Sequence, residues 1–485
     1  MRPVEIENPA MEIQSRCART LAAVVLSLVA AGCRSGSDAE APGRAARTDG
    51  AQAASGTTAR PAEPVANAVI NTVADAATDV ATDVARDAAT NAVTNAVALV
   101  SRLDLERYKA TIKGLTQFGD RLQGTARNRA AVDWIEAQLQ SYGCATERVR
   151  YTQPPPVAPA PAPAAGAGGA VSGGAVAGAS ATAPASPAAI PRTAIPRAVG
   201  GGRPRGSRLA APPNTDPVRQ PNQALRALNA EASMPGARDE VFCTKVGATT
   251  PSEMYIIGAH MDGRGFGEAA NDDGSGTALV MELARILSMP DVVTNRTIRF
   301  ALWNSEEGGL NGARAYVEQR QARQGREEPA GSGRYPEPRW LGMIQHDMML
   351  FDHGAPRADG TVSPEQRAEA DVNIEFQSAA KLADGAMQLA FFFHGANERH
   401  ATDYPAQVGP HMTNTDSTPF MDLVPSISLR ENERGVQVGS GWDPHWHQPT
   451  DLYATFTDKD FRLGLNAAQT TLGAVAELAG ARVRK

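Results

Sequence analysis

Short apolar segments alternate with helix-like ones in the second half of the chain, and this alternation constrains the fold more than any other feature. Three apolar segments have the composition of buried strands, over residues 254–258, 297–303 and 341–345. Apolar residues recur with helical spacing in three others, over 277–288, 313–320 and 457–481. The alternation predicts an α/β fold, a single domain on a mixed, mainly parallel twisted sheet with helices on both faces.

The expected domain does not use the whole chain of 485 residues. Residues 34–98 are rich in small and polar residues and predict a disordered or weakly helical tether. The α/β domain would cover 99–485, with helical spacing over 103–142 and a C-cap at Gly143. Within it, residues 153–228 are dominated by proline, alanine and glycine, which bury too little apolar surface to fold. We expect this stretch to be a low-complexity insertion between two adjacent strands.

The first 33 residues are typical of an export signal. Arg16 and Arg19 precede an apolar run, 21–31, that is too short to span a bilayer. Small residues then lead to Cys33, as in the lipobox of bacterial lipoproteins, where the cysteine carries the lipid. We expect a lipoprotein-type signal over 1–33, with ordinary cleavage after Gly32 as the alternative. The protein would be anchored in the cell envelope, periplasmic or at the outer membrane, or secreted, and the lipid would be its only membrane contact.

Two of the four cysteines remain for the folded domain, Cys144 and Cys243. Both lie in strand-like segments, and an oxidising compartment favours a disulfide between them. Two buried free thiols are the alternative. If the bridge forms, we expect it to close the base of the insertion.

Residues that can bind a metal follow the expected strands. His260 and Asp262 come directly after the first strand, and Asp347 follows the third. A strand-end histidine can bind a metal while a nearby acid holds its second ring nitrogen, although such a pair is also common as a purely structural motif. Ligands bind where the strands of such sheets end. We therefore expect these side chains to face one site.

Three further motifs add carboxylates and imidazoles. Residues 271–276 bring two aspartates to a helix N-terminus, either as a cap or as ligands. Glu306 and Glu307 follow the second strand, where neighbours point to opposite faces, so that one can bind a metal while the other holds a proton. Residues 441–451 place histidines and aspartates close together near the C-terminus. Two histidines with three carboxylates suit zinc, and one bridging carboxylate would make a two-metal site.

The order of these motifs resembles that of the M28 family of zinc aminopeptidases. The resemblance covers residues 105–152 and 238–480. It rests on five segments, 258–262, 270–276, 304–308, 346–348 and 446–451. Two more segments, 118–125 and 415–420, are similar to that family's N-terminal helix region and to the part before its last ligand.

The resemblance implies two zinc ions per chain. One would be bound by His260 and Asp347 and the other by Glu307 and His447. Asp272 would bridge the two ions.

The resemblance also implies roles for the neighbours of these ligands. The family's bridging aspartate directly follows an asparagine or its equivalent, which selects Asp272 rather than Asp273, and the peptide bond between them is commonly cis. Asp262 would orient the imidazole of His260. Glu306 would be the general base, taking a proton from a zinc-bridging water and passing it to the leaving amine.

Some positions depart from the family's pattern or compete with the expected ligands. Trp446 stands where a tyrosine often stabilises the oxyanion, and it can donate only through its indole N–H. His445 competes with His447 for the role of last ligand, and His346 competes with Asp347.

The activity implied is that of a two-zinc exopeptidase that hydrolyses N-terminal residues from peptides. Carboxypeptidase activity also occurs in the wider family, glutaminyl cyclases share the fold but use one zinc, and an inactive envelope-binding protein is a third alternative. Residues 348–410 match the family poorly, so side-chain preference does not transfer.

The net charge of −6 does not suggest a nucleic-acid-binding surface, and we expect no such partner.

Overall fold

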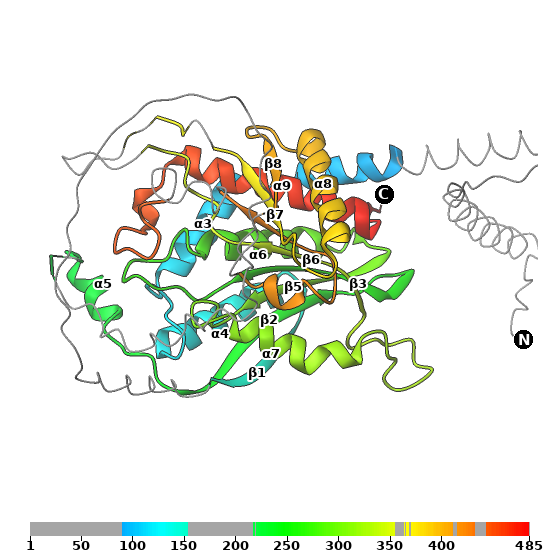
Figure 1. Ribbon diagram of the computed structural model, residues 1–485, viewed down its shortest axis with the longest axis horizontal. Coiled ribbons are helices and arrows are strands. Elements are labelled where there is room, and N and C mark those ends of the chain that lie inside the picture. The colour runs from blue at the N-terminus through cyan, green and yellow to red at the C-terminus, as the bar shows by residue number, and fades with distance from the viewer. Residues whose placement is uncertain are drawn as a thin grey trace, which may run out of the picture. The chain divides into compact units, whose positions relative to one another are not determined.

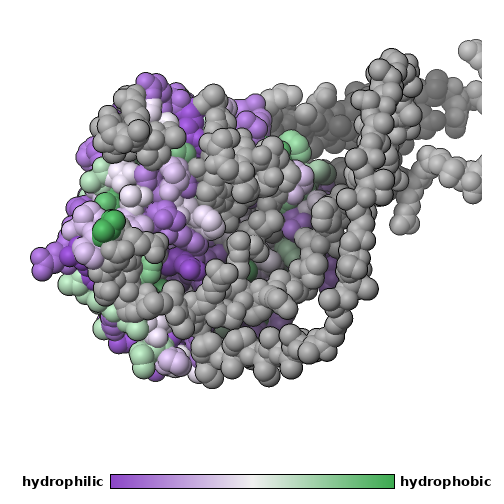
Figure 2. Space-filling view, turned by 60° about the vertical axis from the view of Figure 1, so that its left-hand side comes forward, coloured by the Kyte–Doolittle hydropathy of each residue, from purple (hydrophilic) through white to green (hydrophobic). Residues whose placement is uncertain are grey.

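A computed structural model of the chain describes residues 90–153, 217–218, 220–354, 363, 365–367, 370–410, 415–431 and 443–484. The expected signal peptide with Cys33, the tether up to residue 89 and most of the insertion lie outside these residues. Among the described residues, no helix is both long and apolar enough to cross a membrane. Figure 2 shows one face of the molecule, where the described surface is a mosaic of hydrophilic and near-neutral residues with scattered hydrophobic ones.

An eight-stranded sheet forms the centre of the fold, in the order β1-β2-β5-β3-β6-β9-β7-β8 (Figure 1). Its strands are β1 (Ala145–Gln153), β2 (Gly236–Lys245), β3 (Thr250–His260), β5 (Arg296–Trp303), β6 (Arg339–His346), β7 (Val372–Phe376), β8 (Ala406–Gly409) and β9 (Ser426–Arg430). The four central strands, β5, β3, β6 and β9, run parallel, as do β7 and β8. Antiparallel pairs join β1 to β2, β2 to β5 and β7 to β9. The predicted mixed, mainly parallel sheet is confirmed.

Helices cover both faces of this sheet, as predicted. The larger core packs one face against α3 (Leu105–Thr116), α4 (Ala126–Ser141), α6 (Gly274–Leu287), α8 (Ala383–His400) and α9 (Asp458–Ala479). The smaller core packs the other face against α7 (Asn311–Arg320) and the 3-10 helix η3 (Thr418–Phe420). Alternate residues of β3 serve the two cores, Ile257 the larger one and Ile256 the smaller one, because successive strand side chains point to opposite faces.

Smaller elements complete the described fold. They are α5 (Gln223–Leu228), the 3-10 helices η2 (Gln321–Arg323) and η4 (Tyr453–Thr455), and a separate two-stranded ladder of β4 (Val292–Val293) and β10 (Arg482–Val483).

Two boundaries predicted from the sequence are wrong. Residues 90–100 are helical, and Ala96 and Leu99 are buried in the larger core, so ordered structure begins before residue 99. The expected insertion, 153–228, is too long at both ends, because residue 153 ends β1 and residues 220–228 are ordered. The helical spacing over 103–142 is confirmed as two helices, α3 and α4. The C-cap of α4 is Tyr142, and the expected Gly143 follows it with a φ of +76°.

The expected disulfide between Cys144 and Cys243 is present, but it does not lie at the base of the insertion, where it was predicted. The antiparallel register of β1 and β2 pairs Thr146 with Cys243 at one end of the ladder and Gln153 with Gly236 at the other. The insertion leaves from the Gln153 end. The bridge therefore fastens the opposite end of the ladder and does not close the base of the insertion.

Candidate metal centre

Five side chains expected to bind metal converge where the central parallel strands end. His260 is the last residue of β3, Asp347 directly follows β6, and Glu307 follows β5 after a short turn. Asp272 precedes Asp273, the N-cap of α6, and His447 comes from the loop before α9. They form two groups whose ligand atoms lie within 4.8 Å of one another, and Asp272 belongs to both.

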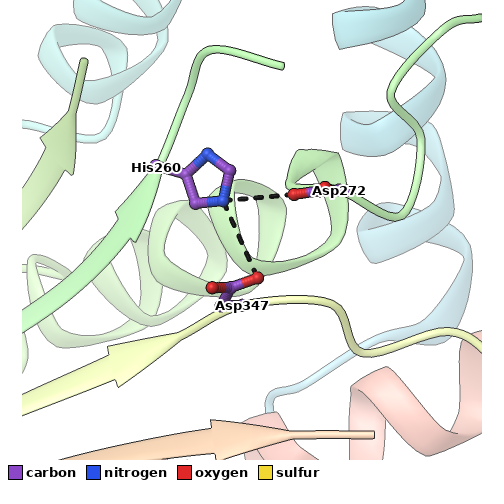
Figure 3. Close-up of side chains that lie close together, drawn as sticks. All are labelled: His260, Asp272 and Asp347. Carbon is purple, nitrogen blue, oxygen red and sulfur yellow. Dashed lines mark ion pairs between the residues drawn. The ribbon is translucent and has the colours of Figure 1, made fainter. Parts of the chain in front are cut away.

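The first group consists of His260, Asp272 and Asp347, which point toward one another in Figure 3. The Nε2 atom of His260 lies 3.2 Å from Oδ1 of Asp272 and 3.7 Å from Oδ1 of Asp347. All three residues are buried. A single ring nitrogen thus faces one oxygen of each carboxylate, as three ligands of one ion would.

The second group consists of Asp272, Glu307 and His447. The Nε2 atom of His447 lies 3.0 Å from Oδ2 of Asp272 and 2.8 Å from Oε1 of Glu307. Asp272 therefore directs one oxygen to each group, which is the arrangement of a bridging carboxylate. Two imidazoles and three carboxylates, divided in this way, fit two zinc ions.

Asp273 is placed differently from its neighbour, although both come from the same motif. Its Oδ1 atom accepts a hydrogen bond from the Gly276 backbone N–H at 2.8 Å and so caps α6, while its Oδ2 accepts from the backbone N–H of His260 at 3.1 Å. The peptide bond between Asp272 and Asp273 is cis, as the resemblance implied. Asp273 thus supports the loop, while Asp272 reaches both imidazoles.

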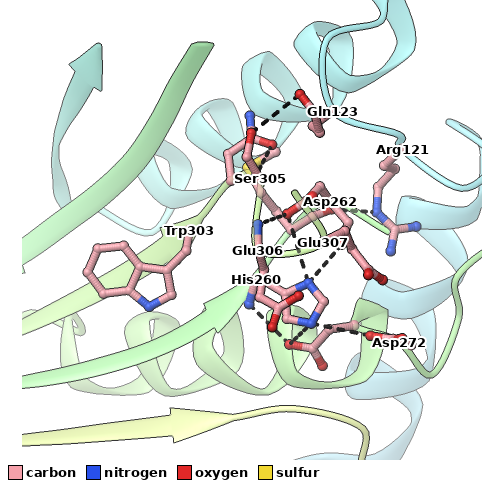
Figure 4. Close-up of polar contacts among 12 residues, drawn as sticks. Arg121, Gln123, His260, Asp262, Asp272, Trp303, Ser305, Glu306 and Glu307 are labelled. Carbon is pink, nitrogen blue, oxygen red and sulfur yellow. Dashed lines mark hydrogen bonds and ion pairs between the residues drawn. The ribbon is translucent and has the colours of Figure 1, made fainter. Parts of the chain in front are cut away.

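Asp262 contacts two parts of the centre through different atoms (Figure 4). Nδ1 of His260 lies 2.9 Å from its backbone carbonyl oxygen but 3.9 Å from its carboxylate. The carboxylate instead accepts a hydrogen bond from the backbone N–H of Glu306 at 3.0 Å. The His260 ring is therefore oriented by the Asp262 main chain, and the Asp262 side chain holds the turn that carries Glu306.

Arg430, at the end of β9, is a partner of the centre that the sequence reasoning missed. The side chain is buried, and its Nη2 lies 2.8 Å from Oδ2 of Asp347. Its Nε lies 3.4 Å from Glu375. The only signal in the sequence was an arginine directly after an apolar strand-like segment, which is too common a pattern to single out.

Opposite charges control the protonation of the ligand side chains. Burial lowers the pKa of His447, but Glu307 and Asp272 outweigh it and raise this pKa to about 9. Burial also raises the pKa of Asp272, yet the two imidazoles hold it well below the usual range. The carboxylates of the donor set therefore stabilise positive charge on the imidazoles.

Glu306 sits in a different electrostatic environment. Burial raises its pKa well above the usual range; His260 opposes that shift, while Glu307 and Asp416 add to it. A carboxyl group with a raised pKa is suited to accept and hold a proton at neutral pH.

The two competing histidines lie outside both groups. His346 turns away from the centre, with its Nε2 2.8 Å from the Thr471 hydroxyl on α9 and its Nδ1 3.2 Å from the Gly258 carbonyl oxygen. Burial lowers its pKa to about 4. The ring of His445 is directed to the Thr450 hydroxyl, with Nδ1 at 2.9 Å. Neither ring belongs to the ligand groups found in the described part of the chain.

Trp446 and the end of the insertion border the centre. The indole ring of Trp446 stacks on the His447 imidazole, with the ring centroids 4.1 Å apart. Nε2 of the buried Gln220 donates to the carbonyl oxygens of Phe266 at 2.8 Å and of Pro449 at 3.2 Å. The ordered end of the insertion thus ties together two loops at the site, which its low-complexity sequence did not indicate.

Residues 241–468 match the model of peptidase family M28. The probable lipoprotein aminopeptidase LpqL of Mycobacterium tuberculosis is 43% identical over 82 residues, 17% of this chain and 16% of that protein. Carboxypeptidase Q of Xenopus laevis is 34% identical over 73 residues, 15% of this chain and 16% of that protein. The chain thus spans about one sixth of the length of these curated relatives. A solved structure of BSAP, a zinc aminopeptidase from Bacillus subtilis, has the same fold, with a TM-score of 0.50 and 14% identity over 79% of this chain and 96% of that one.

Proposed function

Because residues 241–468 belong to peptidase family M28, we propose that this chain is a two-zinc exopeptidase that removes N-terminal residues from peptides. The observation that carries the proposal is the position of Asp272, which directs one carboxylate oxygen to each of two histidine–carboxylate pairs. That geometry supports two ions that share a ligand, whereas a single-zinc cyclase would need only one group. The names of the relatives, aminopeptidase and carboxypeptidase, support hydrolysis of peptides from one end.

Each ligand pair has a defined part in this proposal. His260 and Asp347 would hold one zinc, Glu307 and His447 the other, and Asp272 both. When bound, the ions would lower the pKa of a water molecule and polarise the scissile carbonyl group.

Glu306 is proposed as the general base. Its main chain is held by the Asp262 carboxylate, and its raised pKa suits a group that must carry a proton. It would take a proton from the attacking water and deliver it to the leaving amine. The N–H of Trp446, whose ring stacks on His447, stays a predicted donor to the oxyanion.

An exported location is part of the same proposal. The Cys144–Cys243 disulfide is typical of oxidising compartments, and one relative is named a lipoprotein. A lipid on Cys33 would anchor the enzyme to the cell envelope. Replacing Cys33 with serine should release the protein from the membrane fraction, and an unchanged distribution would argue against the anchor.

The decisive assay compares hydrolysis of a peptide panel with free and with blocked N-termini, with and without a chelator. Blocking the N-terminus should abolish cleavage; cleavage that instead depends on a free C-terminus would establish a carboxypeptidase. Zinc content should be two ions per chain, and one ion at full activity would favour a cyclase-like centre.

The base assignment is tested by Glu306→Gln. General base catalysis contributes about 10²- to 10⁴-fold, so kcat should fall by at least about 10²-fold while two zinc ions remain bound. Glu337→Gln is a control for the same chemical change away from the centre, because Glu337 is buried in the smaller core and binds Arg299 and Tyr316. It should lose stability and keep its kcat. Normal kcat in Glu306→Gln would refute the assignment.

A further inference from the structure

Asn271, the residue before the bridging aspartate, is held by a carboxylate from the last-ligand loop. Its backbone N–H donates to Oδ1 of Asp451 at 2.8 Å, and the next N–H, that of Asp272, donates to Oδ2 at 3.1 Å. Asp451 lies four residues after His447. The main chain of the bridging ligand is thereby fastened to the segment that carries a ligand of the second group.

The carboxamide of Asn271 makes contacts in two other directions. Its Nδ2 donates to Oε2 of Glu431 at 2.8 Å and to Oδ2 of Asp443 at 2.9 Å. Its Oδ1 accepts from the backbone N–H groups of Met349 and Leu350, both at 2.9 Å. Carboxylates only accept and backbone N–H groups only donate, so this network fixes which end of the carboxamide faces which partners.

These partners lie in the segments that carry the remaining parts of the centre. Met349 and Leu350 come just after Asp347, while Glu431 follows Arg430, the ion-pair partner of Asp347. Asp443 begins the described segment that contains His447. One fully buried side chain therefore links the bridging ligand to the segments that carry one outer ligand of each group, Asp347 and His447.

We propose that Asn271 is a positioning residue that sets the zinc affinity of both groups by holding the bridging Asp272 in register with Asp347 and His447. This inference rests on the proposed zinc chemistry and adds a residue that touches neither zinc nor substrate. Partners of metal ligands typically contribute 10- to 100-fold to metal affinity.

Only a carboxamide donates to these two carboxylates and accepts from these two backbone N–H groups at once. Aspartate has the same shape, but it would turn an acceptor oxygen toward two buried carboxylates, those of Glu431 and Asp443. Both donated hydrogen bonds would be lost, which is costly in a buried position. The isosteric change therefore tests hydrogen bonding without removing side-chain volume.

The experiment measures zinc binding to the full chain by competition with a chelator of known affinity, together with the melting temperature. In Asn271→Asp, zinc affinity should fall at least tenfold, and saturating zinc should raise the melting temperature less than in the wild type. Adding Asp443→Asn restores a donor opposite the new carboxylate, because Oδ2 of Asp443 faces Asn271 while its Oδ1 accepts from the His445 N–H. The double variant should therefore regain part of the affinity. Asn397→Asp is the matched control, since that buried carboxamide joins α8 to Thr470 on α9, away from the centre.

The proposal requires Asn397→Asp to lose stability and keep wild-type zinc affinity. Wild-type affinity in folded Asn271→Asp would overturn the proposal, and so would an equal loss of affinity in the control. If Asn271→Asp does not fold, Asn271→Ser, which is too short to bridge these partners, is measured with the same criterion. A wild-type chain that binds two zinc ions but cleaves no peptide would refute the proposed function only.

Discussion

Gly265 provides a sharp test of how closely two loops pack, the one between β3 and α6, which carries Asp272, and the one that carries His447. Its φ is +106°, and a Cβ atom at this position would lie 2.4 Å from the carbonyl carbon of His447 and 2.8 Å from its Cα. Real Cβ atoms essentially never come within 3.0 Å of another heavy atom, so Gly265→Ala must displace the backbone of a proposed zinc ligand. The substitution should therefore weaken both the fold and the metal centre.

The size of the effect can be separated into two parts by a control glycine. Gly236 has a φ of +131°, and a Cβ atom there would meet nothing within 4 Å. Gly236→Ala should therefore show only the backbone strain, about 1–3 kcal/mol. Gly265→Ala should add the cost of overpacking, about 1–3 kcal/mol, unless the loop moves away and relieves it.

The assay is urea unfolding of both variants, followed by zinc titration of the folded proteins. Gly265→Ala should be less stable than Gly236→Ala, or bind zinc at least tenfold more weakly, because the contact is relieved either by strain or by moving His447. Gly236→Ala should keep wild-type zinc affinity. Equal stabilities together with equal zinc affinities would refute the close packing of these loops.

Two further predictions concern parts of the fold that support the site. Replacing both Cys144 and Cys243 with serine removes a bridge across a sequence separation of 99 residues. The free energy of unfolding should fall by about 2–5 kcal/mol, while zinc affinity stays unchanged. An unchanged free energy of unfolding in urea titrations would contradict this prediction. Burial lowers the pKa of His346 from 6.5 to about 4 in the folded state. As the pH falls, the unfolded chain therefore binds the proton at a higher pH than the folded chain does. The free energy of unfolding should fall by about 3 kcal/mol between pH 6.5 and pH 4. His346→Gln should be less sensitive to acid, and parallel stability curves for variant and wild type would exclude the effect.

The sheet and the ligand positions could be predicted because their signals are local. Each of the three predicted strands falls within an observed one, and three of the five ligands come at or just after the end of such a strand. A short stretch around His260 or Glu307 therefore contains both the strand and the residue that it delivers. The rules of parallel sheets then bring those ends to one edge.

The supporting contacts could not be predicted because they join distant segments. Asn271 donates to residues 160 and 172 positions away, and its own sequence motif contains no trace of those partners. Arg430 meets Asp347 only because β9 is inserted next to β6 in the sheet. The disulfide was expected, but its position depended on the register of β1 against β2, which the composition of the two strands does not specify.

The distribution of charge explains why these long-range contacts matter. Burial raises the pKa of Asp273 well above its usual range, with Asp347 and Asp272 adding to the effect against the opposing His260. Carboxylates packed together in this way are costly to bury unless N–H groups and cations face them. A backbone N–H group donates to Asp273, and Arg430 pairs with Asp347. The two carboxylate oxygens of Asp272 are directed at two imidazoles. Cations bound between those groups would complete the balance, so that metal binding and the stability of this edge of the sheet depend on the same residues.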